Sequence, residues 1–201
     1  MFAARLNAGL RPVPAWVLYP LGALPALWLF WLALTGGLGV DPVKTLEREL
    51  GLIGLQLIVA GLAVTPLRRF TGVSLVRFRR AIGVLAFAYV ALHLAVWVTL
   101  DLQFRWAEIG ADIVKRPYIM MGMAGFLMLL PLALTSNDRS LRRLGPLRWR
   151  RLHRLAYPAA LAGGVHYLWL VKAWPVEPML YLAAMVCLLA LRLVPAPRRA
   201  A

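Results

Sequence analysis

Six long apolar runs constrain the fold of this 201-residue chain more than any other feature. They cover about 15–34, 50–66, 81–100, 117–135, 155–171 and 176–194. Each is close to the roughly 20 residues that a helix needs to cross about 30 Å of hydrocarbon. The runs lack the alternation of polar and apolar residues that marks the strands of a membrane barrel. The sequence therefore predicts an all-α, polytopic membrane protein: a six-transmembrane-helix bundle.

The connections between the runs are too short for a separate soluble domain. The longest, about 136–154, has fewer than twenty residues. The chain also has no P-loop and no glycine-rich nucleotide fingerprint. We therefore expect residues 1–201 to form a single membrane domain, and any nicotinamide, molybdenum or flavin domain to belong to another polypeptide.

The charged residues divide unequally between the two sides of the predicted membrane. Segments 1–12, 67–80, 136–154 and the C-terminal tail, with Arg192, Arg198 and Arg199, hold 17 bases and one acid. The intervening loops hold six bases and seven acids. The positive-inside rule then places both termini in the cytoplasm, which requires an even number of spans. The net charge of +15 thus reflects membrane topology rather than binding of nucleic acid.

The three histidines of the chain all lie in or at the edge of apolar runs, where an imidazole is costly without a partner. His93 is 13 residues past Arg80, and His166 is 13 residues past His153. At about 1.5 Å per residue, both His93 and His166 lie about 20 Å in, in the outer half of the bilayer. The sequence predicts that these two histidines lie at the same depth on different helices.

Two imidazoles at matching depth suit the axial ligation of one haem iron. Such a b-type haem is six-coordinate, which favours electron transfer over oxygen binding. Covalent attachment is excluded because the chain has no C-x-x-C-H motif, and its single Cys187 excludes a cysteine metal cluster. The alternative for each histidine is a hydrogen bond to a neighbouring helix.

His153 has no histidine at the same level on the third run, where Arg79 and Arg80 stand. Three roles stay open: ligation of a second haem with an unusual partner, contact with a flavin or quinone headgroup, or a position at the membrane interface. The arginines Arg77, Arg79 and Arg80 have two interpretations, as topology signals or as partners of haem propionates or an anionic headgroup.

No arrangement of residues in the sequence is typical of bond-making catalysis. We therefore expect electron transfer without a substrate-transforming active site in this chain. One alternative is a transmembrane ferric or metal reductase. Another is a non-redox transporter or assembly factor whose histidines relay protons, but the runs contain few polar groups, with Gln56 a rare exception.

Several motifs resemble the MsrQ (YedZ) family, within the ferric-reductase-like transmembrane superfamily. The matching stretches are Asp41-Pro42 with Lys44, Thr65-Pro66-Leu67, Arg79-Arg80 with Gly83, Tyr89, Leu92-His93, Lys115-Arg116-Pro117-Tyr118-Ile119, Leu134-Thr135-Ser136, Arg142-Arg143-Leu144-Gly145, Trp149, Leu152-His153, Tyr157, His166-Tyr167-Leu168-Trp169 and Lys172. The resemblance covers nearly the whole chain.

The resemblance implies a haem b subunit of the bacterial inner membrane that passes electrons from the quinol pool to MsrP. MsrP is a periplasmic molybdopterin enzyme that reduces methionine sulfoxide in oxidised envelope proteins. The resemblance also implies an FMN, for which no contact residue is assigned. His93 and His166 match the haem-ligand positions of the family, and His153 matches a third family histidine. The third run lacks the cytoplasmic-side histidine found in much of the superfamily, which leaves a second haem open.

Overall fold

A computed structural model describes residues 2–171, 173 and 175–194 of the chain. The described residues are helical with turns and bends, and contain no strand, which confirms the predicted all-α class. Lys172 of the family resemblance, and Arg198 and Arg199 of the basic tail, lie outside the described residues.

Each of the six apolar runs forms a helix. These helices are α2 (Leu18–Thr35), α3 (Pro42–Thr71), α4 (Arg79–Val96), α6 (Pro117–Leu134), α8 (Ala156–Leu170) and α9 (Val176–Ala190). Among the described residues, four helical segments are long and apolar enough to cross a membrane: Ala15–Thr35, Pro42–Thr71, Val76–Asp101 and Pro117–Leu134. Helices α8 and α9 have 15 residues each, fewer than a full crossing usually takes, so the count of six spans stays a prediction.

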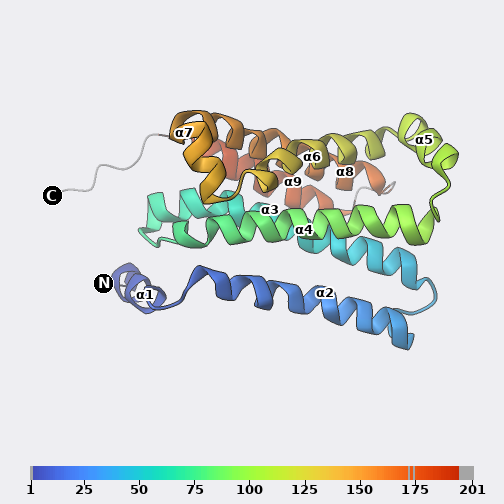
Figure 1. Ribbon diagram of the computed structural model, residues 1–201, viewed down its shortest axis with the longest axis horizontal. Coiled ribbons are helices and arrows are strands. Elements are labelled where there is room, and N and C mark those ends of the chain that lie inside the picture. The colour runs from blue at the N-terminus through green and yellow to red at the C-terminus, as the bar shows by residue number, and fades with distance from the viewer. Residues whose placement is uncertain (1, 172, 174, 195–201) are drawn as a thin grey trace.

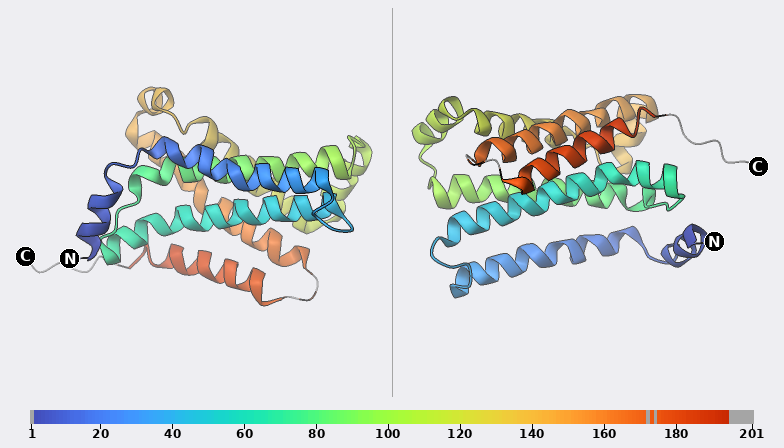
Figure 2. Two further views of the ribbon diagram at one scale, coloured as in Figure 1. Left: turned by 90° about the horizontal axis from the view of Figure 1, so that it is seen from below. Right: turned by 180° about the vertical axis from the view of Figure 1, so that it is seen from behind.

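The shorter helices lie at the two ends of the bundle (Figure 1). Helices α1 (Phe2–Leu10) and α7 (Asp138–Leu152) lie at the end that holds the arginine-rich segments, which we call the basic end. Helix α5 (Trp106–Lys115) lies at the opposite end, which we call the outer end. Figure 2 shows that α1 and the last turn of α9 share the basic end, as an even number of crossings requires.

Helix α2 has an apolar surface that no other described part of the chain covers. Its only buried residues are Ala26 and Leu29, while Leu27, Trp28 and Trp31 are exposed. A helix that is apolar all round and yet unburied within the protein is typical of a segment that contacts lipid. The fold is therefore that of a multi-pass membrane protein.

Helix α3 is the central element of the bundle and is longer than the apolar run 50–66 that predicted it. It begins at the capping residue Asp41, whose carboxylate accepts from the Lys44 N–H at 3.0 Å, and Pro42 occupies the first turn. It ends at Gly72, whose φ of 80° favours glycine. The hydropathy pattern found only the apolar middle of this helix, because its two ends carry charged residues.

Packing divides the bundle into two main helix pairs, α3 with α4 and α6 with α8. Leu46 and Leu50 of α3 form a buried cluster with Tyr89 of α4 and with α2. Further along α3, Leu55 packs against Ala160 of α8 and Met185 of α9. Helix α3 thus links the two pairs and fixes where their side chains meet.

Tyr89 joins α4 to the backbone of α2 next to Pro25. Its hydroxyl donates to the Gly22 carbonyl at 2.6 Å and accepts from the Ala26 N–H at 3.1 Å. Gly22 and Ala26 are the two partners of one helical hydrogen bond, so the phenol inserts at the point where Pro25 disturbs the helix. Tyr89 is 2% exposed, so water cannot replace its hydroxyl.

We expect Tyr89→Phe to lower the free energy of unfolding by about 1–2 kcal/mol, because buried polar groups on α2 lose a partner. The measurement is the thermal midpoint of the purified protein in detergent. Tyr19→Phe is the matched control, since Tyr19 is an exposed tyrosine of α2. Equal midpoints for Tyr89→Phe and the control would contradict this role.

Candidate cofactor site

His93 of α4 and His166 of α8 lie against each other near the outer end of the bundle. Their ring centres are 6.2 Å apart and their planes are inclined by 73°. His93 precedes the end of its helix at Val96 by less than one turn, and His166 precedes the end of α8 at Leu170 by about one turn. The structure thus brings together the two residues that the sequence places at the same depth.

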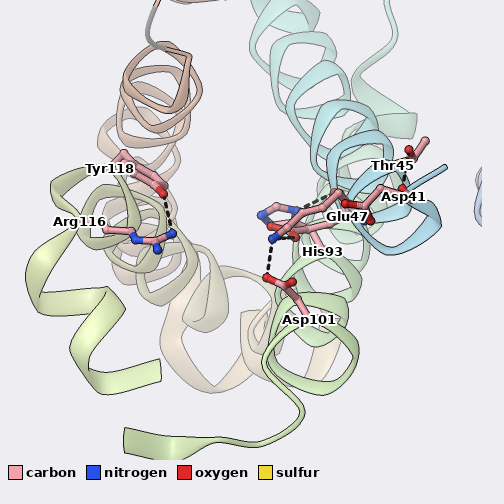
Figure 3. Close-up of polar contacts among 8 residues, drawn as sticks. Asp41, Thr45, Glu47, His93, Asp101, Arg116 and Tyr118 are labelled. Atoms are coloured by element: carbon pink, nitrogen blue, oxygen red, sulfur yellow. Dashed lines mark hydrogen bonds and ion pairs between the residues drawn. The ribbon is translucent and has the colours of Figure 1, made fainter. Parts of the chain in front are cut away.

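Each of these imidazoles is held by a backbone carbonyl of the partner helix in its pair. His93 Nδ1 lies 2.8 Å from the Glu47 carbonyl of α3, as Figure 3 shows, and His166 Nδ1 lies 2.7 Å from the Tyr118 carbonyl of α6. A carbonyl oxygen only accepts, so Nδ1 carries the proton in both rings. Nε2 of each neutral imidazole is then left with a free lone pair.

Two glycines make these hydrogen bonds sterically accessible. Gly51 and Gly122 each follow the accepting residue, Glu47 or Tyr118, by one helical turn. A Cβ at Gly51 would lie 2.9 Å from His93 Nδ1, and a Cβ at Gly122 would lie 2.8 Å from His166 Nδ1. Any side chain at either position would push the ring away from its carbonyl.

The spacing of the two rings fits one metal ion between them. Two metal–imidazole bonds of roughly 2 Å, plus roughly 1 Å from each nitrogen to its ring centre, give about 6 Å. The observed 6.2 Å agrees with this distance. The fixed Nδ1 protons leave both Nε2 atoms as ligands, so the residues fit an iron with two axial imidazoles, as in a b-type haem.

An ion-pair cluster lies beside His93 at the outer end (Figure 3). Lys44 Nζ lies 2.5 Å from Asp101 Oδ2 and 3.6 Å from Glu47 Oε2. These contacts tie the first turns of α3 to the segment that follows α4. Since the Glu47 carbonyl also holds His93, the cluster braces the helix that orients the imidazole.

The chain leaves α4 through a π-helical segment, η3 (Trp97–Asp101), rather than through a simple turn. The Leu102 N–H donates to the Trp97 carbonyl at 2.9 Å, and Gln103 and Phe104 then adopt positive φ angles of 48° and 59°. Such wide turns are frequent at functional sites. Here the segment places Asp101 where Lys44 can reach it.

Tyr118 marks the outer edge of the site on the α6 side. Arg116 donates to its hydroxyl at 3.3 Å, and this hydrogen bond raises the pKa of Arg116 (Figure 3). Tyr118 also lines a surface depression of about 330 Å³ with Pro117 and Trp169. This depression opens beside the residue whose carbonyl holds His166.

His153 lies apart from this pair, at the basic end, in the short helix η4 (His153–Leu155). Its ring stacks on Trp149 at 3.7 Å between centres, and Nε2 lies 3.1 Å from the Thr135 hydroxyl. That hydroxyl donates to the Pro131 carbonyl at 2.6 Å, so its oxygen accepts from Nε2 of His153. Burial, then the nearby Arg79 charge, lower the pKa of His153.

The histidines stand out in the sequence, whereas the groups that orient them do not. Glu47, Gly51, Tyr118 and Gly122 were not assigned a role at this site. The available signal was a repeated spacing, since each glycine follows the residue with the accepting carbonyl by four positions in an apolar helix. That spacing is too common to identify a site until the opposing histidine is known.

Comparison with known proteins shows the family of the chain. The family described as "Ferric reductase like transmembrane component" matches residues 49–164. A protein of Brucella anthropi is 47% identical over 89% of this chain and 81% of its own length. One of Agrobacterium fabrum is 48% identical over 92% of this chain and 85% of its own. Both are named "Protein-methionine-sulfoxide reductase heme-binding subunit MsrQ".

No solved structure matches the chain. The sequence relatives nevertheless cover most of its length, including both histidines of the pair and the helices that hold them. The chain therefore belongs to the MsrQ family of ferric-reductase-like transmembrane components.

Proposed function

We propose that this protein is a haem b electron-transfer subunit. It passes electrons from the quinol pool of the respiratory chain across the bacterial inner membrane to MsrP, a periplasmic molybdopterin methionine sulfoxide reductase. The reduced partner then repairs oxidised envelope proteins. The names of the relatives support the haem and the link to methionine sulfoxide reduction.

The observation that carries this proposal is the pair His93 and His166. Their ring centres are 6.2 Å apart, and each ring is held by a hydrogen bond from Nδ1. These residues are the axial ligands in our proposal. The two imidazoles would hold the haem, which would supply reversible one-electron transfer rather than a binding position for a substrate. Hydrogen bonds from Nδ1 to the Glu47 and Tyr118 carbonyls orient the rings and raise the basicity of Nε2.

The direction of transfer follows from the place of the pair near the outer end. With both termini in the cytoplasm and six spans, the outer end faces the periplasm, so the site lies close to the aqueous partner. The charge asymmetry of the chain supports this orientation. The surface beside Tyr118 and Trp169 is then the exit route that we propose toward MsrP.

Electron entry is proposed at the basic end, from quinol, with an FMN bound to the protein as in the family it resembles. His153 lies at this end and is the third candidate cofactor contact. Its Nε2 is engaged by Thr135 and its ring by Trp149, so only Nδ1 is left for another partner. We therefore propose one haem, at the His93–His166 pair.

A transmembrane metal reductase is the second candidate, because the matching family description names ferric reductases. Such a protein would use the same histidine pair and deliver electrons to Fe(III) outside the membrane. We favour methionine sulfoxide reduction because the relatives named MsrQ match a larger share of the chain than the family description does.

The purified protein is expected to show the visible spectrum of a low-spin haem with two imidazole ligands. His93→Ala and His166→Ala should each lose this spectrum, because one axial ligand is removed. His153→Ala should keep it with unchanged haem content. A full bis-imidazole spectrum in the His93→Ala or His166→Ala protein would refute the assignment.

Gly51→Ala and Gly122→Ala are expected to lower haem affinity about 10–100-fold, because each added methyl displaces an imidazole from its carbonyl. Haem titration of the apoprotein measures the effect. Gly61→Ala is the control, since its Cβ would meet only Ile82 at an ordinary 3.7 Å. Wild-type affinity in both test variants would show that the carbonyl contacts are dispensable.

Electron delivery is tested in proteoliposomes that contain the haem-loaded protein, a reduced quinone analogue and the purified periplasmic partner. We expect methionine sulfoxide reduction to fall more than about 100-fold in the His93→Ala protein, because a haem there would lose one of the two imidazoles that hold it for electron transfer. Reduction of a ferric chelate is assayed in parallel. Turnover of the chelate without any turnover of methionine sulfoxide would favour the metal reductase instead.

A further inference from the structure

The basic end contains a second cavity, separate from the histidine pair. Its volume is about 240 Å³, and it lies where the last turns of α3 and the chain after α9 meet the first turn of α8. The residues that line it are Thr65, Pro66, Arg69, Tyr157, Leu191 and Arg192. Two guanidinium groups and a phenol thus surround a space with apolar walls.

Arg192 is held rigidly at this cavity by neutral groups. It donates to the Tyr157 hydroxyl at 2.9 Å and to the Leu62 carbonyl at 2.7 Å, and its guanidinium lies over the Tyr157 ring at 4.9 Å. Its Nε is buried and has no hydrogen-bond partner among the described residues. The guanidinium keeps its positive charge although the residue is partly buried.

Arg69 is anchored in the same way. It donates to the Leu191 and Arg192 carbonyls at 3.3 and 3.2 Å, which again supply no negative charge. Arg79 is near enough for its charge to oppose that of Arg192. Within the part of the chain that the structure describes, none of these three arginines is in an ion pair, although Arg80 close by is paired with Asp138.

Membrane topology alone does not explain this arrangement. The positive-inside rule needs cations in the loops, where water solvates them, as at the exposed Arg68, Arg142 and Arg143. Arg69 and Arg192 are instead partly buried and fixed against backbone carbonyls. Partly buried like charges are costly unless an anion accompanies them.

We propose that this cavity binds a phosphate group. The planar guanidinium groups offer paired N–H donors that match phosphate oxygens, and the free Nε–H of Arg192 supplies an unused one. Basic pockets between membrane helices suit anionic headgroups, and Pro66 and Leu191 add an apolar wall. The phosphate comes from an anionic phospholipid of the bilayer or from a soluble phosphate compound.

The test uses the haem-loaded protein in nanodiscs, with two probes. One arm measures retention of phosphatidylglycerol, by native mass spectrometry, from nanodiscs that mix it with phosphatidylcholine. The other measures binding of radiolabelled inorganic phosphate in nanodiscs of phosphatidylcholine alone. We expect Arg69→Gln and Arg192→Gln to weaken binding at least tenfold, with Arg143→Gln, exposed at the same end, unchanged.

The outcomes separate the sources. Retention of phosphatidylglycerol alone assigns a lipid headgroup, and binding of inorganic phosphate alone assigns a soluble ligand. Tyr157→Phe removes only one hydrogen-bond partner of Arg192 and should weaken phosphate binding by a smaller factor. This variant replaces an arginine variant that loses its haem spectrum and has therefore not folded. The proposal would be overturned if the wild-type protein bound neither probe, or if all variants bound the probes equally.

Discussion

The hydrogen bond from an imidazole Nδ1 to a helix carbonyl is the interaction on which the site depends. In an apolar interior a histidine needs a partner, and a backbone carbonyl is the acceptor that a neighbouring helix always offers. That carbonyl already accepts from its own helix, so the imidazole must approach closely enough to use the second lone pair. Gly51 and Gly122 permit this approach, and the two Nε2 atoms are then available to a metal.

This hydrogen bond from an imidazole to a helix carbonyl occurs twice, once in each helix pair. His93 uses the Glu47 carbonyl of α3, and His166 uses the Tyr118 carbonyl of α6. Because α3 packs on α4 and α6 on α8, the geometry of each histidine is set within its own pair. The distance between the rings depends instead on how the pairs dock, through contacts such as Leu55 with Ala160. Orientation and spacing are therefore controlled by different parts of the core.

The sequence predicted the helices and the meeting of His93 with His166, because hydropathy and helical rise are local properties. It could not predict the Glu47 and Tyr118 carbonyls, since every helical residue has one and only tertiary packing selects two of them. It also missed the π-helical turn at Trp97, which places Asp101 within reach of Lys44 on another helix. His153 stayed ambiguous because its partners, Thr135 and Trp149, come from other elements.

The basic side chains at the two ends of the bundle have different partners. At the outer end, Lys44, Arg105 and Arg116 each meet a carboxylate, so the surface beside the histidine pair is nearly neutral. At the basic end, the partly buried Arg69 and Arg192 donate hydrogen bonds to carbonyls and a phenol, and neither meets a carboxylate among the described residues. An arginine that only directs membrane insertion needs its positive charge, but it does not need to be buried. Burial of uncompensated guanidinium groups therefore requires a second cause, which an anion in the adjoining cavity supplies.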